Sequence, residues 1–266
     1  MKIVEIGNIK IGGDNPLALI AGPCVIESED IVFRTAEEVK KIADRLGFPL
    51  IFKSSYLKDN RSSVETFQGP GMEKGLEILQ RVKNKFDIPV LSDIHDLHDA
   101  ASCAQVLDVI QVPAYLSMQT GLVVAVAQTG KVVNVKKGQF LHPADMQNVI
   151  NKIKSTGNDK ILLTDRGTFF GYHNLVLDMR NLKVMRDLGY PVVLDPTHAI
   201  RKYGVSSSDK RGGAKEFIFS LSRAGTAAGI DDIIRAFTRG YFFYLRGHIL
   251  FLVVYSKVRA QFLYML

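Results

Sequence analysis

Short apolar runs alternate with amphipathic stretches along most of the chain. The runs are LALIAG from Leu17, PLIFK from Pro49, PVLSD from Pro89, VIQVP from Val109, VVNVK from Val132, ILLTD from Ile161 and PVVLD from Pro191. Continuous apolar runs of this length are typical of parallel strands that are buried on both faces of a sheet. The segments between them have the apolar spacing of helices. The alternation therefore predicts an α/β fold with helices covering a parallel sheet.

Local signals place several of these elements. Ser28 is a suitable N-cap for a helix, with Glu29 and Asp30 in its first turn, and the apolar face continues through Ile42. The same periodicity predicts helices over 72–86 and 146–153. Before the first long strand, KIVEI and IKI flank the pair Gly7-Asn8, which predicts a β-hairpin over Lys2–Ile11.

The length and composition favour one large domain. The 266 residues, 47% of them apolar, can bury the core of one α/β barrel or of two smaller domains. An open doubly wound sheet is an alternative, but no GxGxxG or Walker-type loop follows any of the apolar runs. Polar residues instead end nearly every predicted strand. A (β/α)8 barrel gathers all such ends on one face, so the barrel is the preferred prediction.

Charge and cysteine content narrow the function. The net charge of +7 comes from basic residues spread along the chain, without an arginine-rich arm, so small anionic substrates are favoured over nucleic acid. Cys24 and Cys103, without a signal peptide, indicate a reducing compartment, and we expect a cytoplasmic protein. We expect no membrane span, since Arg246 and His248 interrupt the apolar stretch from Tyr241 to Tyr255.

The densest polar cluster is KSSYLKDNRSS, from Lys53 to Ser63, directly after an apolar run. Lysine supplies a point charge, Arg61 a planar fork for phosphate or carboxylate oxygens, and Asn60 and Ser62 neutral hydrogen bonds. A solvated basic loop would be the simpler interpretation of this segment alone. Similar residues end the other strands, however, and this favours a binding site for anions.

In a barrel, these strand ends would surround one cavity. They are Cys24, the segment from Lys53 to Ser62, Asp93 and His95, Gln111, Asn134 and Lys136, Asp165 and Arg166, and Asp195 and His198. Structural roles remain open for Asp195, Gln111 and His95, which could pair with loops or backbone. Lys136 and Arg166 are harder to explain in that way, because a buried unpaired cation is costly.

A set of motifs in chain order resembles the 3-deoxy-D-manno-octulosonate 8-phosphate synthase family. The motifs are GPCVIES, FKSSYLKDNRSS, SDIH, IQVPAYL, NVKKGQF, TDRGTFFGYHNL and DPTH, and the resemblance runs from the hairpin to about Gly229. It implies a (β/α)8 barrel that condenses phosphoenolpyruvate with arabinose 5-phosphate in lipopolysaccharide biosynthesis. The related heptulosonate phosphate synthases, which use erythrose 4-phosphate, carry a KPRT-like segment where this chain has DNRSS. An imine-forming aldolase is a further alternative.

The resemblance also implies residue roles. Lys53, Lys58, Lys136 and Arg166 would hold phosphoenolpyruvate, while Asn60, Arg61 and Ser62 would bind the sugar phosphate near Gln111 and Asp93. The catalytic set would be Lys53, Asn60, Asp93, Lys136 and His198. No Schiff base is needed, so Lys136 would act electrostatically and in proton transfer. A homotetramer is the assembly that the resemblance implies.

The cysteine of the GPC motif bears on metal dependence. Metal-dependent members of the family have cysteine at this position, where the others have asparagine. Cys24 and His198 would then be two ligands of a divalent transition metal such as zinc or iron. For an isolated cysteine, a buried apolar role would be the better interpretation.

The C-terminal segment departs from the family. We expect a catalytic barrel over 1–229 and an atypical segment over 230–266, because no Asp or Glu occurs between Ile233 and Leu266. An altered reading frame would explain this composition, and two expected metal ligands would be missing. We therefore expect an open barrel with impaired turnover, or ligand binding without catalysis. The alternative is an unusual eighth βα unit that closes the barrel.

Overall fold

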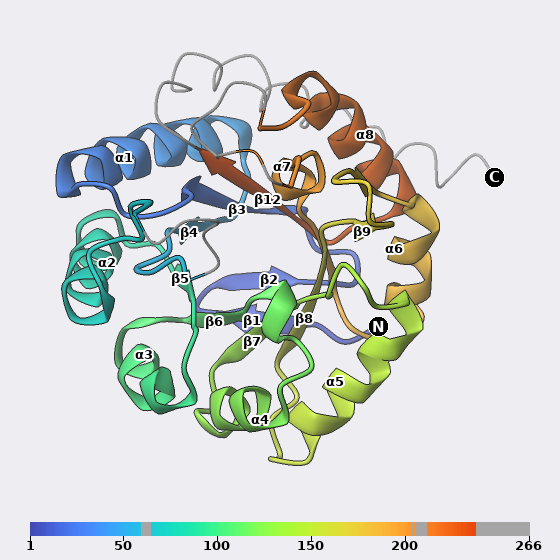
Figure 1. Cartoon of the computed structure of the whole chain (residues 1–266). Coiled ribbons are helices and arrows are strands. Elements are labelled where there is room, and N and C mark those ends of the chain that lie inside the picture. The colour runs from blue at the N-terminus through green and yellow to red at the C-terminus, as the bar shows by residue number, and fades with distance from the viewer. Residues whose placement is uncertain (60–64, 204, 206–211, 238–266) are drawn as a thin grey trace.

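Eight parallel strands close into a barrel in the computed structural model, which describes residues 1–59, 65–203, 205 and 212–237 (Figure 1). The strands follow the order β11-β12-β3-β4-β5-β6-β7-β8. Their bounds are β3 (Ala18–Pro23), β4 (Leu50–Lys53), β5 (Val90–Asp93), β6 (Val109–Val112), β7 (Val132–Lys136), β8 (Ile161–Asp165), β11 (Val192–Leu194) and β12 (Asp232–Phe237). The predicted barrel is confirmed, and the open doubly wound sheet is wrong.

Helices surround this barrel in the view of Figure 1. They are α1 (Glu29–Leu46), α2 (Met72–Phe86), α3 (Ala100–Val106), α4 (Thr120–Gln128), α5 (Met146–Lys154), α6 (Met179–Arg186) and α8 (Ile218–Ala228). The short helix α7 (Pro196–Ala199) lies inside this ring, next to β12. The predicted start of α1 is confirmed, because Ser28 Oγ accepts a hydrogen bond of 3.3 Å from the Ile31 N–H. Gly47, with φ of 72°, ends the helix in the left-handed conformation that glycine adopts most readily.

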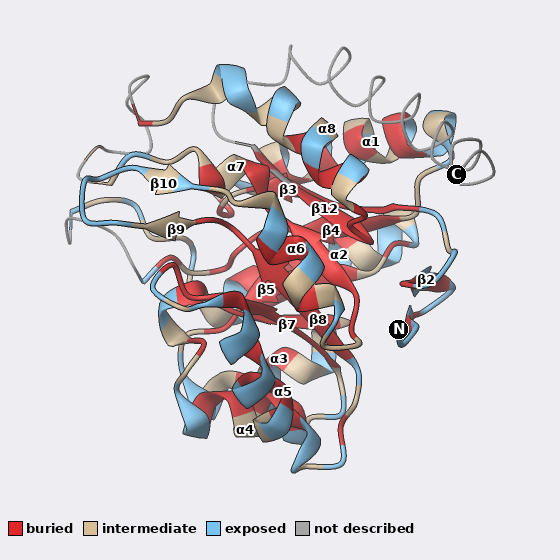
Figure 2. Cartoon of the chain, turned by 90° about the vertical axis from the view of Figure 1, so that its right-hand side faces the viewer, coloured by how far each residue is buried: buried red, intermediate tan, exposed pale blue. Residues whose placement is uncertain are grey.

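The N-terminal hairpin closes the amino end of the barrel. β1 (Val4–Ile6) and β2 (Ile9–Ile11) pair around Gly7-Asn8 as predicted. Their buried side chains belong to one apolar cluster with inward-facing residues of the barrel strands: Ala18, Ile20, Ile51, Leu91, Val109, Val132, Leu162, Val193 and Ile234. A short hairpin of β9 (Thr168–Phe169) and β10 (Leu175–Val176) follows β8 at the opposite end (Figure 2). The amino end is therefore apolar and covered, and the carboxyl end remains for a site.

The eighth strand corrects one expectation from the sequence. β12 pairs with β3 from Asp232 to Phe237 and with β11 at Asp232 and Ile233, so an open barrel is wrong. The alternative of a closing eighth strand is confirmed, and the barrel extends past the boundary expected at residue 229. Residues 238–266, on which the remaining expectations for the C-terminus fall, lie outside the described residues. Among the helices of the described residues, none has the length and apolar character that crossing a bilayer requires.

Candidate active site

The predicted site residues that the structure describes lie at the carboxyl ends of the strands. Lys53, Asp93 and Lys136 are the last residues of β4, β5 and β7, and Arg166 directly follows β8. These four side chains are all less than a tenth exposed. Asn60, Arg61 and Ser62 lie outside the described residues, so their predicted roles stay predictions.

Asp93 joins the cations of the Lys53–Ser63 segment. Lys53 Nζ lies 3.8 Å from Asp93 Oδ1, and Lys58 forms an ion pair with Asp93 Oδ2. Ser55 Oγ donates a hydrogen bond of 2.7 Å to the same oxygen. Burial alone would raise the pKa of Asp93, but the positive charges of Lys53, Lys58 and Lys136 hold it well below its usual range. Asp93 is therefore an ionised anchor for two buried cations.

The pKa of Lys53 is lowered by the same surroundings. Burial disfavours its ammonium form, and the charges of Lys58 and Lys136 add to this effect while Asp93 opposes it. The pKa of Lys53 falls to about 8. An added anion would relieve this repulsion between cations, which is the behaviour expected of a site for an anionic ligand.

A chain of hydrogen bonds crosses the barrel interior from Asp93. Gln111 Nε2 donates to Asp93 Oδ1, and Gln111 Oε1 accepts a bond of 3.0 Å from Asn134 Nδ2. Thr164 Oγ1 donates a bond of 2.6 Å to Asn134 Oδ1. Gln111 is fully buried with both ends of its amide engaged. Its contact with Asp93 places it beside the cation cluster and orients that carboxylate, while its predicted role in sugar phosphate binding stays a prediction.

A second carboxylate, Asp195, connects Lys136 with His198. Lys136 Nζ lies 2.7 Å from Asp195 Oδ2, and His198 Nδ1 lies 2.8 Å from the same oxygen. Asp195 is completely buried. Burial would raise its pKa, but His198 and Lys136 together lower it well below the usual value. Lys136 is thus a paired buried cation, which accounts for how its burial is tolerated.

Cys24 and His198 come together as predicted, from segments that follow β3 and β11. Their Sγ and Nε2 atoms are 3.7 Å apart. Burial would raise the pKa of the Cys24 thiol, but Lys58, the contact with His198 and Lys53 outweigh this effect and lower it to about 5. Gly22 lets β3 reach this position, since a Cβ there would lie 2.0 Å from the backbone oxygen of Lys53. Cys24 is therefore a thiolate at neutral pH.

The Cys24–His198 pair suits one edge of a metal site. Ligand distances of about 2.3 Å for sulfur and 2.0–2.1 Å for nitrogen in a tetrahedron require about 3.6 Å between the two donor atoms. The observed 3.7 Å agrees with this value, and Asp195 orients the imidazole through its other nitrogen. In the described part of the chain, no group of three or more His, Cys, Asp and Glu side chains could hold a metal ion. These two residues therefore fit a metal as a partial ligand set.

Arg166 contacts the backbone of His198 and the side chain of Tyr203. Its Nη2 donates a bond of 2.9 Å to the His198 backbone oxygen, and its Nη1 donates one of 2.6 Å to the Tyr203 hydroxyl. The Arg166 Nε is buried and has no hydrogen-bond partner among the described residues. An anion bound beside Arg166 would supply the acceptor that this N–H lacks.

Several residues of the site were given no specific role from the sequence. Ser55 connects Lys53 and Asp93, and Tyr203 contacts Arg166 from a loop, where neither strand position nor periodicity points to it. Asp195 was left open between a structural and a functional role, although its i,i+3 spacing to His198 was a usable signal. His95 Nε2 lies 3.0 Å from the Leu57 backbone oxygen, which is the structural alternative considered for it.

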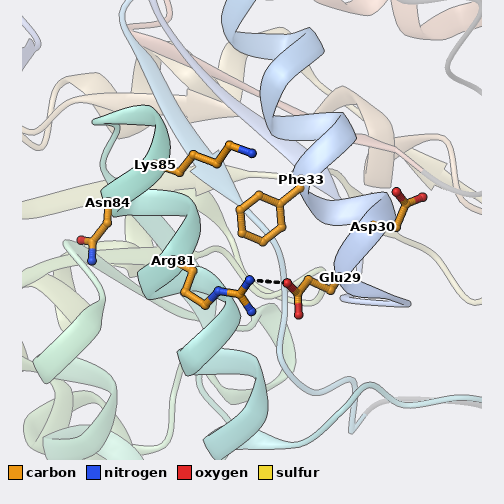
Figure 3. Close-up of a pocket in the computed structure, with 6 residues that line it drawn as sticks. All are labelled: Glu29, Asp30, Phe33, Arg81, Asn84 and Lys85. Atoms are coloured by element: carbon orange, nitrogen blue, oxygen red, sulfur yellow. Dashed lines mark ion pairs between the residues drawn. The ribbon is translucent and has the colours of Figure 1, made fainter.

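A pocket of about 670 Å³ lies apart from this site, between α1 and α2 (Figure 3). Arg81 and Lys85 lie over the Phe33 ring at 5.4 and 5.2 Å from its centroid. Arg81 also forms an ion pair of 2.5 Å with Glu29, and both of these side chains are at least 40% exposed. Exposed pairs of this kind contribute little to stability. The residues that line this pocket include none of the buried charged side chains found at the barrel mouth.

Comparisons with known proteins agree with this geometry. The sequence profile of the DAHP synthetase I family matches residues 1–235. A curated 2-dehydro-3-deoxyphosphooctonate aldolase from Trichlorobacter lovleyi is 57% identical over 232 residues, which cover 87% of this chain and 85% of the relative. Relatives of the same name from Geotalea uraniireducens and Geobacter sulfurreducens are each 55% identical, over 88% and 86% of this chain and 85% and 84% of their own lengths.

Proposed function

Because the chain belongs to the DAHP synthetase I family and its curated relatives are named 2-dehydro-3-deoxyphosphooctonate aldolases, we propose that it condenses phosphoenolpyruvate with D-arabinose 5-phosphate. The products are 3-deoxy-D-manno-octulosonate 8-phosphate and inorganic phosphate, and the reaction belongs to lipopolysaccharide biosynthesis. C3 of phosphoenolpyruvate bonds to the aldehyde carbon, water adds at C2, and the C2 phosphate leaves. The chain is accordingly a transferase.

The observation that carries this proposal is the convergence of buried cations at the barrel mouth. Lys53, Lys58, Lys136 and Arg166 are each less than a tenth exposed, and they outnumber the carboxylates Asp93 and Asp195 together with the Cys24 thiolate. Burying cations in excess over anions is costly unless a ligand neutralises them. A small molecule with both a phosphate and a carboxylate, such as phosphoenolpyruvate, meets this requirement.

The same charges allow the reaction itself. Two anionic substrates repel each other, so their negative charge must be neutralised before C3 can approach the aldehyde. We assign Lys53, Lys58, Lys136 and Arg166 to phosphoenolpyruvate. Lys136, held by Asp195, neutralises negative charge on phosphoenolpyruvate and takes part in proton transfer.

For the sugar phosphate, we propose Asn60, Arg61 and Ser62, which combine a guanidinium fork with hydroxyl and amide groups. Asp93 and Gln111 would complete this half of the site. Gln111 acts on the sugar through Asp93, because both ends of its amide are already hydrogen-bonded. Asp93 is the group that can accept a hydrogen bond from a sugar hydroxyl.

We propose that Cys24 and His198 hold a divalent transition metal, zinc or iron, when one is bound. Such an ion would supply a Lewis acid to polarise the carbonyl of the sugar phosphate. The thiolate character of Cys24 and the Asp195–His198 contact support this assignment. The thiolate also fits a reducing compartment, and we propose the cytoplasm.

Assembly into a homotetramer is also part of the proposal. The β9–β10 hairpin leaves Phe170, Tyr172 and Val176 more than half exposed. Exposed apolar side chains gathered on one hairpin are suited to contacts between copies of the chain. Light scattering on the purified protein would give the mass of the assembly.

Release of inorganic phosphate from phosphoenolpyruvate tests the proposed reaction. We expect phosphate release with arabinose 5-phosphate and little release with erythrose 4-phosphate. A preference of the enzyme for erythrose 4-phosphate would identify a heptulosonate phosphate synthase. Thermal stabilisation by phosphoenolpyruvate without phosphate release would instead identify a protein that binds phosphoenolpyruvate but does not convert it. Loss of release in the Lys136→Gln variant would connect activity to this site.

A further inference from the structure

Through its hydroxyl, Tyr203 connects the ends of several barrel strands. Its hydroxyl accepts a bond of 2.6 Å from Arg166 Nη1, after β8, and one of 2.5 Å from Gln139 Nε2, after β7. The Tyr115 side chain, after β6, also interacts with it. Its backbone N–H donates to the His173 oxygen at 3.0 Å, and its ring packs edge-on against Phe169.

This arrangement limits how the Arg166 guanidinium can lie. Tyr203 and the His198 backbone oxygen take one N–H from each terminal nitrogen, at 2.6 and 2.9 Å. The fork has five N–H donors, so three remain, including the buried Nε without a partner among the described residues. Two fixed contacts therefore orient the plane of the guanidinium while leaving donors for an anion.

We propose that Tyr203 is a positioning residue that fixes Arg166 for the anionic groups of phosphoenolpyruvate. The inference rests on the proposed function, since it takes Arg166 as a phosphoenolpyruvate ligand. Tyr203 itself does not need to touch the substrate. Its contribution is to hold the guanidinium in one orientation before binding, which lowers the entropic cost of forming the complex.

The chemistry of the phenol agrees with this role. The Tyr203 oxygen accepts hydrogen bonds from Arg166 and Gln139, and it accepts them more strongly as a phenolate because it is then charged. Burial by itself raises the pKa of Tyr203, but the Arg166 charge and the bonds from Gln139 and Tyr115 lower it below the ordinary value. The pKa of Tyr115, in contrast, is raised to about 12 by burial and by Tyr203. Arg166 is the one charged side chain for which the described residues show a contact with Tyr203.

Tyrosine ionisation can be followed directly, because the chain contains no tryptophan. In the ligand-free protein, near-ultraviolet absorbance should show one tyrosine that ionises at lower pH than the others. Tyr203→Phe should remove this early transition, and Tyr172→Phe should retain it, since Tyr172 is 83% exposed on the neighbouring hairpin. Tyr115→Phe should move the transition to higher pH by removing one donor to the phenolate.

Binding links the phenol to the substrate. Phosphoenolpyruvate added without the sugar should shift the early transition to higher pH, because the anion offsets the Arg166 charge that lowers it. In steady-state assays, Tyr203→Phe should raise the KM for phosphoenolpyruvate about tenfold, the effect expected for losing one hydrogen bond to a charged group. The kcat and the KM for arabinose 5-phosphate should stay within about twofold, since the phenylalanine keeps the packing against Phe169.

Three results would overturn the inference. One is a ligand-free titration without an early tyrosine, as expected if Tyr203 donated its proton to Gln139. The second is a Tyr203→Phe variant that retains both the transition and the wild-type KM. The third is an equal loss in kcat and both KM values, which indicates a structural role. Failure of the proposed function is distinct from these, because it would abolish phosphoenolpyruvate effects and turnover while leaving the ligand-free titration intact.

Discussion

Asp195 Oδ2 lies 2.8 Å from His198 Nδ1 in the candidate active site. This contact requires Nδ1 to carry a proton and directs the other ring nitrogen, Nε2, toward the Cys24 sulfur. The same carboxylate oxygen holds Lys136. One buried carboxylate thus orients both the proposed metal ligand and the proposed catalytic cation.

The Asp195→Asn variant tests the first of these roles. Removing the charge weakens the bond that orients His198, and we expect affinity for zinc to fall about 10–100-fold, the range typical for such supporting residues. Competition with a chromophoric chelator measures the affinity. Asp187→Asn is the matched control, because Asp187 is 60% exposed and pairs with Lys183 on α6. Equal zinc affinity in wild type and Asp195→Asn would contradict this role.

Cys24 should react as a thiolate at unusually low pH. With its pKa lowered to about 5, the thiolate predominates above that pH, and alkylation by iodoacetamide should lose half its rate only as pH falls to about 5. An ordinary thiol would lose reactivity near pH 8.5. Burial raises the pKa of Cys103 to about 11, so it serves as an internal unreactive control. Peptide mapping distinguishes the two, and a Cys24 midpoint near 8 would refute the thiolate.

Binding of phosphoenolpyruvate should weaken at alkaline pH through Lys53. Its folded-state pKa of about 8 lies below the ordinary value of 10.5, so the ammonium form is present below pH 8 and is lost as pH rises through it. The KM for phosphoenolpyruvate should therefore rise above pH 8. Lys53→Arg should keep its charge and remove this rise. A rise that is the same in both proteins would assign the dependence to another group.

Asp232 should reduce the stability of the fold. It starts β12 beside Ala18 and Val193, whose side chains belong to the apolar interior cluster, and its Oδ2 has no partner within the described residues. Burial and the Asp231 charge raise its pKa well above the usual value, despite the bond from the Ile233 N–H. At pH 7 we expect Asp232→Ala to raise the free energy of unfolding by about 1–3 kcal/mol.

The direction of the Asp232 pKa shift determines how the stability gained by Asp232→Ala depends on pH. The pKa of Asp232 is higher in the folded state than in the unfolded state. The destabilisation by Asp232 is therefore absent below its unfolded-state pKa, and it grows as pH rises toward its folded-state pKa. Urea unfolding of wild type and Asp232→Ala at pH 4 and pH 7 should therefore diverge at the higher pH. The exposed Asp14→Asn change controls for net charge. A difference that does not change with pH would argue against a buried ionisable Asp232.

Much of this architecture could be predicted from apolar patterning. Strands buried on both faces leave long apolar runs, and the first polar residue after each run marks where the strand leaves the barrel. Lys53, Asp93 and Lys136 were found in this way. The Cys24–His198 contact joins residues 174 positions apart, and only the closure of the barrel brings them together.

Other features could not be predicted because their signals are not periodic. β12 contains Asp232 and Arg235 among apolar residues, so its sequence lacks the continuous apolar run of the other strands. Its backbone nonetheless pairs with β3 and β11. Tyr203 lies in a loop, where side-chain contacts depend on the path of the chain and not on spacing. Asn60, Arg61 and Ser62 remain predictions from the sequence, since they lie outside the described residues.

The most direct test of the proposed reaction is identification of its product. Wild type and Lys136→Gln are incubated with phosphoenolpyruvate and arabinose 5-phosphate, and the mixtures are analysed by mass spectrometry. The account predicts an eight-carbon phosphorylated 2-keto acid, formed in equal amount to inorganic phosphate, with wild type and strongly reduced with the variant. Phosphate without that product, or equal product from both proteins, would contradict the assignment of this reaction to the cations at the barrel mouth.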